Sequence, residues 1–104
     1  MITILESVLA FLKSHVISSM TPSDIATLMA PLALDSAWVY LGGSGARQQV
    51  FLLQNNLRVM FQFHAGERLV AYGAYQCEEV WEKDQADMLI SSPPGVDVPL
   101  IICP

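Results

Sequence analysis

The sequence predicts an α+β fold, with two N-terminal helices packed on one face of an antiparallel β-meander of about four strands and a C-terminal edge strand beside it. Two observations carry this prediction. Apolar residues recur at helical spacing in residues 1–34, and three runs rich in Val, Phe, Tyr and Leu follow in residues 36–76. With an acidic segment and tail in residues 77–104, we expect all 104 residues to form one domain.

The first helix is predicted from a stripe of apolar residues at Leu5, Val8, Leu9, Leu12 and Val16. The start of the second helix is indicated by three consecutive features. Thr21 offers a capping hydroxyl, Pro22 suits the first helical position and Asp24 places an acid in the first turn. Pro31 disfavours helical backbone at the preceding residue and therefore predicts the end of this helix.

The three meander runs, 46–54, 57–64 and 68–76, are separated by turn residues at 55–56 and 65–67. If residues 55–56 form a two-residue loop, Leu52 faces Val59 and Val50 faces Phe61. This register places Val59, Phe61, Phe63, Val70, Tyr72 and Ala74 on the core side. The other side then carries Phe51, Leu53, Met60, Leu69 and Tyr75 among Arg58, Gln49 and Gln62, which is more apolar than a face meant only for water.

Two further strands complete the expected sheet. Residues 36–42 predict a strand that a glycine-rich loop joins to the meander, and that loop lacks the Lys and Ser/Thr of a phosphate-binding loop. Residues 96–103 are apolar enough for another strand. Pro99 has no amide hydrogen, so we expect that strand at an edge of the sheet.

The composition favours a binding partner. Hydrophobic residues make up 53% of the chain and charged residues only 14%, which is more apolar surface than a small monomer easily buries. A homodimer or another protein would cover that surface. No apolar run approaches the length of a membrane span, and no signal peptide is evident, so we expect a cytoplasmic protein.

The charge is segregated along the chain. Residues 1–77 balance, so the whole formal charge of −5 arises after Cys77. One interpretation is a solvated face that keeps the domain soluble. The other is a landing site for a basic protein, with an aromatic anchor inside the acids and apolar residues on the outer sheet face. The acids would repel nucleic acid. The candidate partner-binding residues are Glu78, Glu79, Trp81, Glu82, Asp84, Asp87, Phe51 and Met60.

The order of elements also resembles a known family. Met20-Thr21 opens the second helix, a proline ends it, and the aromatic strand at residues 38–40 and the meander up to Leu69-Val70 follow. This order resembles the SmpA/OmlA outer-membrane lipoprotein domain and the related β-lactamase-inhibitor-like folds. Ser19 and Ala30 stand where that family has glycines. The resemblance implies two helices packed on an antiparallel sheet, in a group of folds that hold other proteins.

These observations favour a non-enzymatic protein. The acids lack an accompanying nucleophile, metal set or phosphate loop, and we expect no cofactor and no metal. The leading hypothesis is a bacterial immunity or inhibitor protein that neutralises a basic toxin. The first alternative is a secretion chaperone or assembly scaffold that acts as a homodimer. The second is a small ligand-binding domain or enzyme with a pocket near Tyr72 and Trp38.

Overall fold

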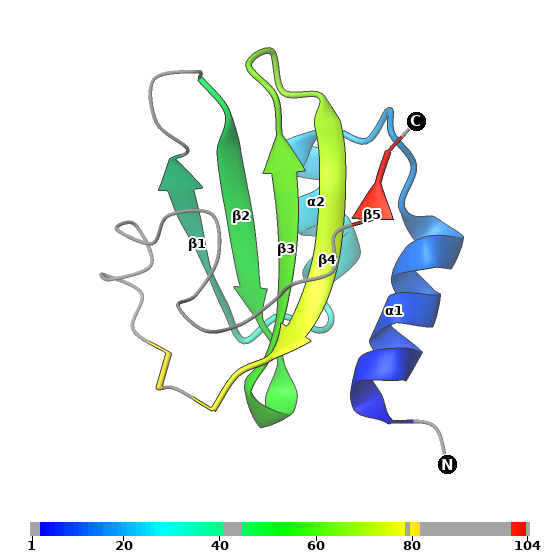
Figure 1. Cartoon of the computed structure of the whole chain (residues 1–104), viewed down its shortest axis with the longest axis vertical. Helices are drawn as coiled ribbons and strands as arrows, with labels where there is room; N and C mark the ends of the chain where they lie inside the picture. Colours follow the sequence, from blue (N-terminus) through cyan, green and yellow to red (C-terminus); the bar gives the residue numbers. More distant parts are fainter. Residues whose placement is uncertain (1–2, 41–44, 79, 82–100, 104) are drawn as a thin grey trace.

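The structure is a computed structural model that describes residues 3–40, 45–78, 80–81 and 101–103. Two helices come first and are followed by the strands of an antiparallel sheet (Figure 1). The elements are α1 (Ile4–His15), α2 (Pro22–Met29), β1 (Asp35–Tyr40), β2 (Arg47–Leu52), a single 3₁₀ turn η2 (Gln54–Asn56), β3 (Leu57–Phe63), β4 (Leu69–Gln76) and β5 (Ile101–Ile102).

The predicted α+β class is confirmed. The sheet has five strands in the order β1-β2-β3-β4-β5, so each strand pairs with its neighbours in the sequence. β5 is the expected C-terminal edge strand, and it pairs with β4 through Tyr72 opposite Ile101 and Ala71 opposite Ile102. The connections between β1 and β4 are short, whereas residues 77–100 separate β4 from β5.

Both helices begin with a capping box. The hydroxyl of Thr3 accepts a hydrogen bond from the Glu6 amide at 3.1 Å, and the hydroxyl of Thr21 accepts one from the Asp24 amide at 3.2 Å. In each helix the acidic side chain in turn accepts a hydrogen bond from the amide of the cap residue. These contacts satisfy amides that lack a partner inside the helix. The predicted cap at Thr21 is therefore confirmed.

The register predicted for the first hairpin is wrong by one residue. The connection is three residues long, and the amide of Leu53 donates to the Leu57 carbonyl at 2.7 Å. Asn55 and Asn56 both adopt left-handed backbone, with φ of 61° and 59°. Asparagine tolerates this conformation better than most residues, which allows the longer turn.

This one-residue change exchanges the two faces of β2. Phe51 lies opposite Val59, and Val50 lies opposite Met60. Phe51 and Leu53 therefore belong to the helix-side core, together with the correctly predicted Val59, Phe61, Phe63, Tyr72 and Ala74. A one-residue slip moves every side chain of a strand to the opposite face, so the error extends along the whole of β2.

A second irregularity changes one end of β4. The register shifts between Gln62 and Phe63, so that Leu69 rather than Val70 lies opposite Phe63. Leu69 is accordingly buried in the helix-side core, and Val70 is only half-buried. The extra residue in β4 is the kind of local bulge that increases strand twist.

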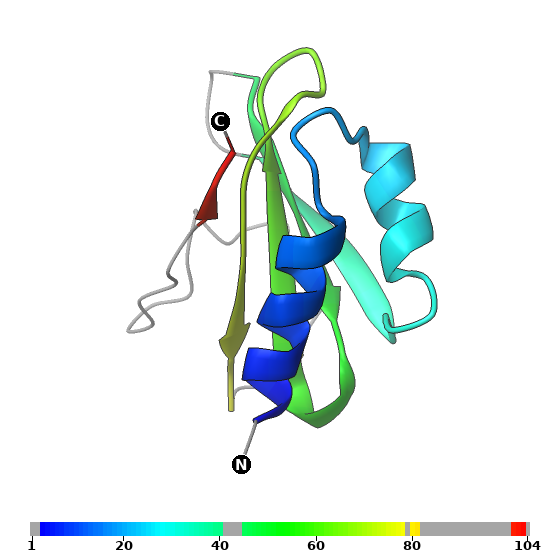
Figure 2. The same ribbon diagram turned by 90° about the vertical axis from the view of Figure 1, so that its right-hand side faces the viewer.

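The helices cover the sheet unequally. α2 lies behind the sheet in Figure 1, and α1 runs beside β4 and contacts it. Figure 2 shows both helices on one side of the sheet and β5 towards the other. Leu12 of α1 and Ile25 and Met29 of α2 are fully buried in the helix-side core. In the part of the chain that the structure describes, no helix is long and apolar enough to cross a membrane.

Loss of the second cap tests the helical layer. We expect Thr21→Ala to lower the free energy of unfolding by about 1 kcal/mol, because the amide of Asp24 loses the hydroxyl that accepts its hydrogen bond. Urea unfolding followed by circular dichroism measures this change. Thr27→Ala is the matched control, since Thr27 is exposed inside the same helix and alanine favours helix there. An equal loss in both variants would contradict the role of the cap.

Candidate functional site

The sheet face opposite the helices, called the outer face below, has a buried apolar centre. Val39, Val50 and Met60 form it, and Tyr75 and Cys77 extend it, each no more than 5% exposed. The indole of Trp81 packs against this cluster. The outer face is therefore apolar, as predicted, although its side chains are Val39 and Val50 rather than Phe51 and Leu53.

One row of residues crosses the outer face near the ends of the strands. Asp35 in β1 lies opposite Leu52 in β2, Leu52 lies opposite Arg58 in β3, and Arg58 lies opposite Tyr75 in β4. Residues that are paired in this way point to the same face. The row therefore brings a carboxylate, a guanidinium and a phenol to one side of the sheet.

Trp81 bridges the two charged members of this row. Its indole Nε1 donates a hydrogen bond to Asp35 Oδ2 at 2.8 Å, and the Arg58 guanidinium lies 5.3 Å from the ring centroid. Neighbouring strands are about 5 Å apart, so these two partners, on β1 and β3, stand on strands about 10 Å apart. Trp81 thus contacts the sheet at two separate strands.

The Arg58 side chain is buried, with only 4% exposed. A buried cation is costly unless it is paired. Arg58 lies near the Tyr75 hydroxyl and faces the Trp81 ring, and the contact with the ring lowers this cost. Burial raises the pKa of Tyr75 above its usual value of 10.0, and the neighbouring Arg58 offsets part of that shift.

The structure describes four of the eight predicted binding residues. Glu78 is exposed and Trp81 is half-buried on the outer face. Phe51 and Met60 are both buried, so neither presents an open surface, and the placement of Phe51 on the outer face is wrong. Glu79, Glu82, Asp84 and Asp87 lie outside the described residues.

The acids before Cys77 have local partners. Glu6 and Asp24 accept hydrogen bonds from backbone amides at the first turns of α1 and α2, where the helix dipole favours negative charge. Glu67 binds Arg47, with Oε1 2.6 Å from the guanidinium Nη2. Asp35 accepts from Trp81. Each of these four carboxylates therefore has a hydrogen-bond donor or a cation within the protein.

Two basic residues before Cys77 are also engaged within the protein. Arg47 binds Glu67 and stacks over Trp38, with 3.9 Å between its Cζ and the ring centroid. Arg58 is buried beneath Trp81. Lys13 lies in the last turn of α1, where the dipole favours a cation. Arg47 and Arg58 are therefore held by contacts within the protein, and Lys13 stands where the helix dipole favours its charge.

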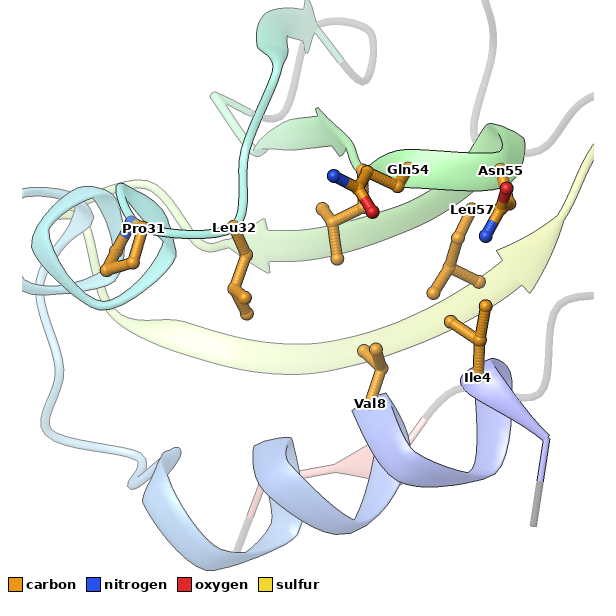
Figure 3. Close-up of a pocket in the computed structure, with 8 residues that line it drawn as sticks. Ile4, Val8, Pro31, Leu32, Gln54, Asn55 and Leu57 are labelled. Atoms are coloured by element: carbon orange, nitrogen blue, oxygen red, sulfur yellow. The ribbon is translucent and has the colours of Figure 1, made fainter.

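An apolar groove opens on the helix side (Figure 3). Ile4 and Val8 approach from α1, Leu32 follows α2, and Leu57 begins β3. The groove has a volume of about 320 Å³, and Ile4 and Leu32 are 52% and 39% exposed at its rim. Gln54 and Asn55 supply polar side chains, and none of the described residues that line the groove is charged. It therefore suits an apolar side chain.

A second hollow, of about 280 Å³, lies where β5 meets β4. Tyr72 and Cys103 contribute to it, but Trp38 does not. Trp38 instead packs against Phe63 and Arg47. The pocket expected between Tyr72 and Trp38 is therefore not one of these two hollows.

The described residues contain no group of three or more His, Cys, Asp and Glu side chains that could hold a metal ion. Cys77 is buried and Cys103 is half-buried, and neither forms a disulfide. Burial raises the pKa of the Cys103 thiol. The Cys103 thiol is accordingly a poor nucleophile where it lies.

No protein-family model matches this chain, and comparisons with characterised proteins and with solved structures found no significant match. What the structure shares with the resemblance noted above is an α+β topology with two N-terminal helices and an antiparallel sheet.

The raised pKa of Tyr75 predicts loss of stability in alkali. The native state holds the Tyr75 proton more tightly than the unfolded chain does. This contribution is complete below the usual tyrosine pKa of about 10, and it is lost as the pH rises from there through the native pKa. We expect the free energy of unfolding, measured in urea at a series of pH values, to fall above about pH 10.

Tyr75→Phe is the comparison for this titration. It removes the ionising hydroxyl near Arg58 and keeps the aromatic ring in the outer-face cluster. Its stability falls less steeply above pH 10 than that of the parent. The same slope in both proteins would show that Tyr75 is not held in its neutral form by the fold.

Proposed function

We propose that this protein is a non-enzymatic protein-binding module, most concretely a bacterial immunity or inhibitor protein of the cytoplasm that occludes a basic toxin. One observation carries the proposal. The acids of the described body are compensated locally, whereas the whole formal charge of −5 arises after Cys77. A segregated charge of this kind attracts an oppositely charged protein and speeds its association.

The arrangement of elements supports a binding role. The resemblance to the SmpA/OmlA domain implies two helices on an antiparallel sheet, and the chain has that topology. Membership of that family is part of the proposal only, because fold likeness does not determine function. The resemblance supports the holding of another protein and names no partner.

A second candidate function rests on the groove of Figure 3. A homodimeric secretion chaperone or assembly scaffold would hold an extended client through apolar contacts. The groove offers exposed Ile4 and Leu32 for this purpose. Phe51, Met60 and Leu69, which the sequence suggested for such contacts, are all buried, so the groove replaces them as the surface for this candidate.

The acids between Glu78 and Asp87 are called the acidic run below. Neutralising its first three acids tests the first candidate function. The tagged protein is used to capture partners from its native cell at low salt, and association with the recovered partner is then timed. We expect Glu78→Gln, Glu79→Gln and Glu82→Gln together to slow association about tenfold, because electrostatic attraction mainly sets the rate of encounter.

The matched control adds the same amount of positive charge elsewhere. Ser7→Lys, Ala10→Lys and Ser14→Lys change three exposed positions of α1, so both variants have the same net charge. Association of the control should remain closer to that of the parent. Equal rates for the two variants would mean that net charge alone acts, and an unchanged rate in the neutralised variant would refute capture by these acids.

A charge introduced at the rim of the groove distinguishes the two candidate functions. Leu32→Glu places a carboxylate at the apolar rim, so a scaffold should lose clients that normally resist high salt. Tyr40→Glu is the control, because Tyr40 is 65% exposed on β1, away from the groove. An inhibitor that binds through the acidic run should keep its partner in both variants. Client retention by Leu32→Glu would exclude the groove as the holding surface.

A further inference from the structure

We propose that Trp81 is a positioning residue that anchors the start of the acidic run to the outer face of the sheet. Its consequence for partner binding rests on the proposed function, but the anchoring itself does not. The inference comes from three contacts that converge on a single side chain. These are the hydrogen bond to Asp35, the cation–π contact with Arg58 and the packing against the apolar cluster of the outer face.

The three contacts need different parts of the indole. The ring nitrogen donates to Asp35 Oδ2, the ring face receives the Arg58 cation, and the large apolar body packs against the cluster of the outer face. Tryptophan supplies all three, with the largest apolar body among the aromatic residues. Phenylalanine would keep the second and third contacts and lose the first.

The sheet prepares both partners for this contact. Asp35 begins β1, and its Oδ1 accepts a hydrogen bond from the amide of Ser36 at 2.8 Å, which orients the carboxylate. Arg58 is buried on β3, the central strand of the sheet, where it lies opposite Tyr75. Partners that are fixed in advance lose little freedom when the indole docks, so the contact is stronger than an exposed hydrogen bond of the same length.

The anchor also connects the end of β4 with the acids. β4 ends at Gln76, the Cys77 amide donates to the Asn56 carbonyl at 3.2 Å, and Trp81 then returns to the outer face. The chain is thus held at Cys77 and again at Trp81. Glu79 and Glu82 lie within two residues of Trp81 in the sequence, which is at most about 7 Å of chain.

This arrangement fixes the chain near Glu78, where the acidic run begins. Charges on a chain that is fixed at two points sample fewer positions than charges on a loose tail. A basic partner therefore meets the first acids at the outer face, on the side of the sheet that the helices leave uncovered. Loss of the anchor should slow capture although the net charge does not change.

Fluorescence of Trp81 tests the anchor without any partner. In a Trp38→Phe background Trp81 is the single tryptophan, because the sequence contains two. We expect Asp35→Ala to shift the emission of Trp81 to longer wavelength, towards that of solvated indole, and to increase its quenching by acrylamide. Asp35→Asn keeps an oxygen that can accept the hydrogen bond, so it should stay close to the background protein.

Glu67→Ala is the matched control, since it removes an acid that binds Arg47 instead. Its Trp81 emission should not change, and circular dichroism verifies that each variant is folded. An unchanged emission in Asp35→Ala would overturn the anchor. A shift of equal size in Glu67→Ala would overturn it as well, because the effect would then be general loosening.

Association with the captured partner tests the consequence separately. Trp81→Ala and Trp81→Phe leave the net charge unchanged, and we expect slower association for alanine than for phenylalanine. If neutralising the acids leaves association unchanged while Asp35→Ala still releases Trp81, the proposed function fails and the anchor stands. If the acids matter but Trp81 keeps its emission in Asp35→Ala, the anchor fails and the proposed function stands.

Discussion

The three-residue turn at Gln54–Asn56 is the constraint on which both faces of the sheet depend. It pairs Phe51 with Val59, and this directs Phe51 to the helices while Val50 and Leu52 turn to the outer face. Leu52 then stands between Asp35 and Arg58, which completes the row that receives Trp81. With a turn of two residues, β2 would present its other set of side chains, and Gln49 would lie on the outer face in place of Gln48 and Val50.

The elements could be predicted from the sequence because each has a local cause. Thr21, Pro22 and Asp24 mark the start of α2 through capping chemistry that acts over a single turn. The alternation of Val59, Phe61 and Phe63 identifies the core side of β3 without reference to other strands. The register of β2 has no such local cause, since two consecutive asparagines are compatible with both turn lengths. Its outcome depends on which pairing buries more apolar surface across the sheet.

The candidate site was less accessible to prediction than the fold. The acids and Trp81 stand out in the sequence, but their relation to Asp35 joins positions 46 residues apart. The sequence feature that points to this site is Arg58, a lone charge between the apolar Leu57 and Val59. A cation in such a strand needs a partner on its own face, and the one aromatic residue inside the acids is a suitable partner. Sequence alone does not show that the two face each other, because that depends on the register of the whole sheet.

The charged residues before Cys77 and those after it differ in how their charges are balanced. Within the body, helix dipoles and the Arg47–Glu67 pair compensate the acids one by one. After Cys77 the acids exceed the single Lys83, so a basic protein is the natural source of countercharge. The most direct test of this account is the association rate of the captured partner with the unmodified protein, measured over a range of ionic strength. The account predicts a rate that falls steeply as salt screens the acids, and a rate independent of salt would contradict it.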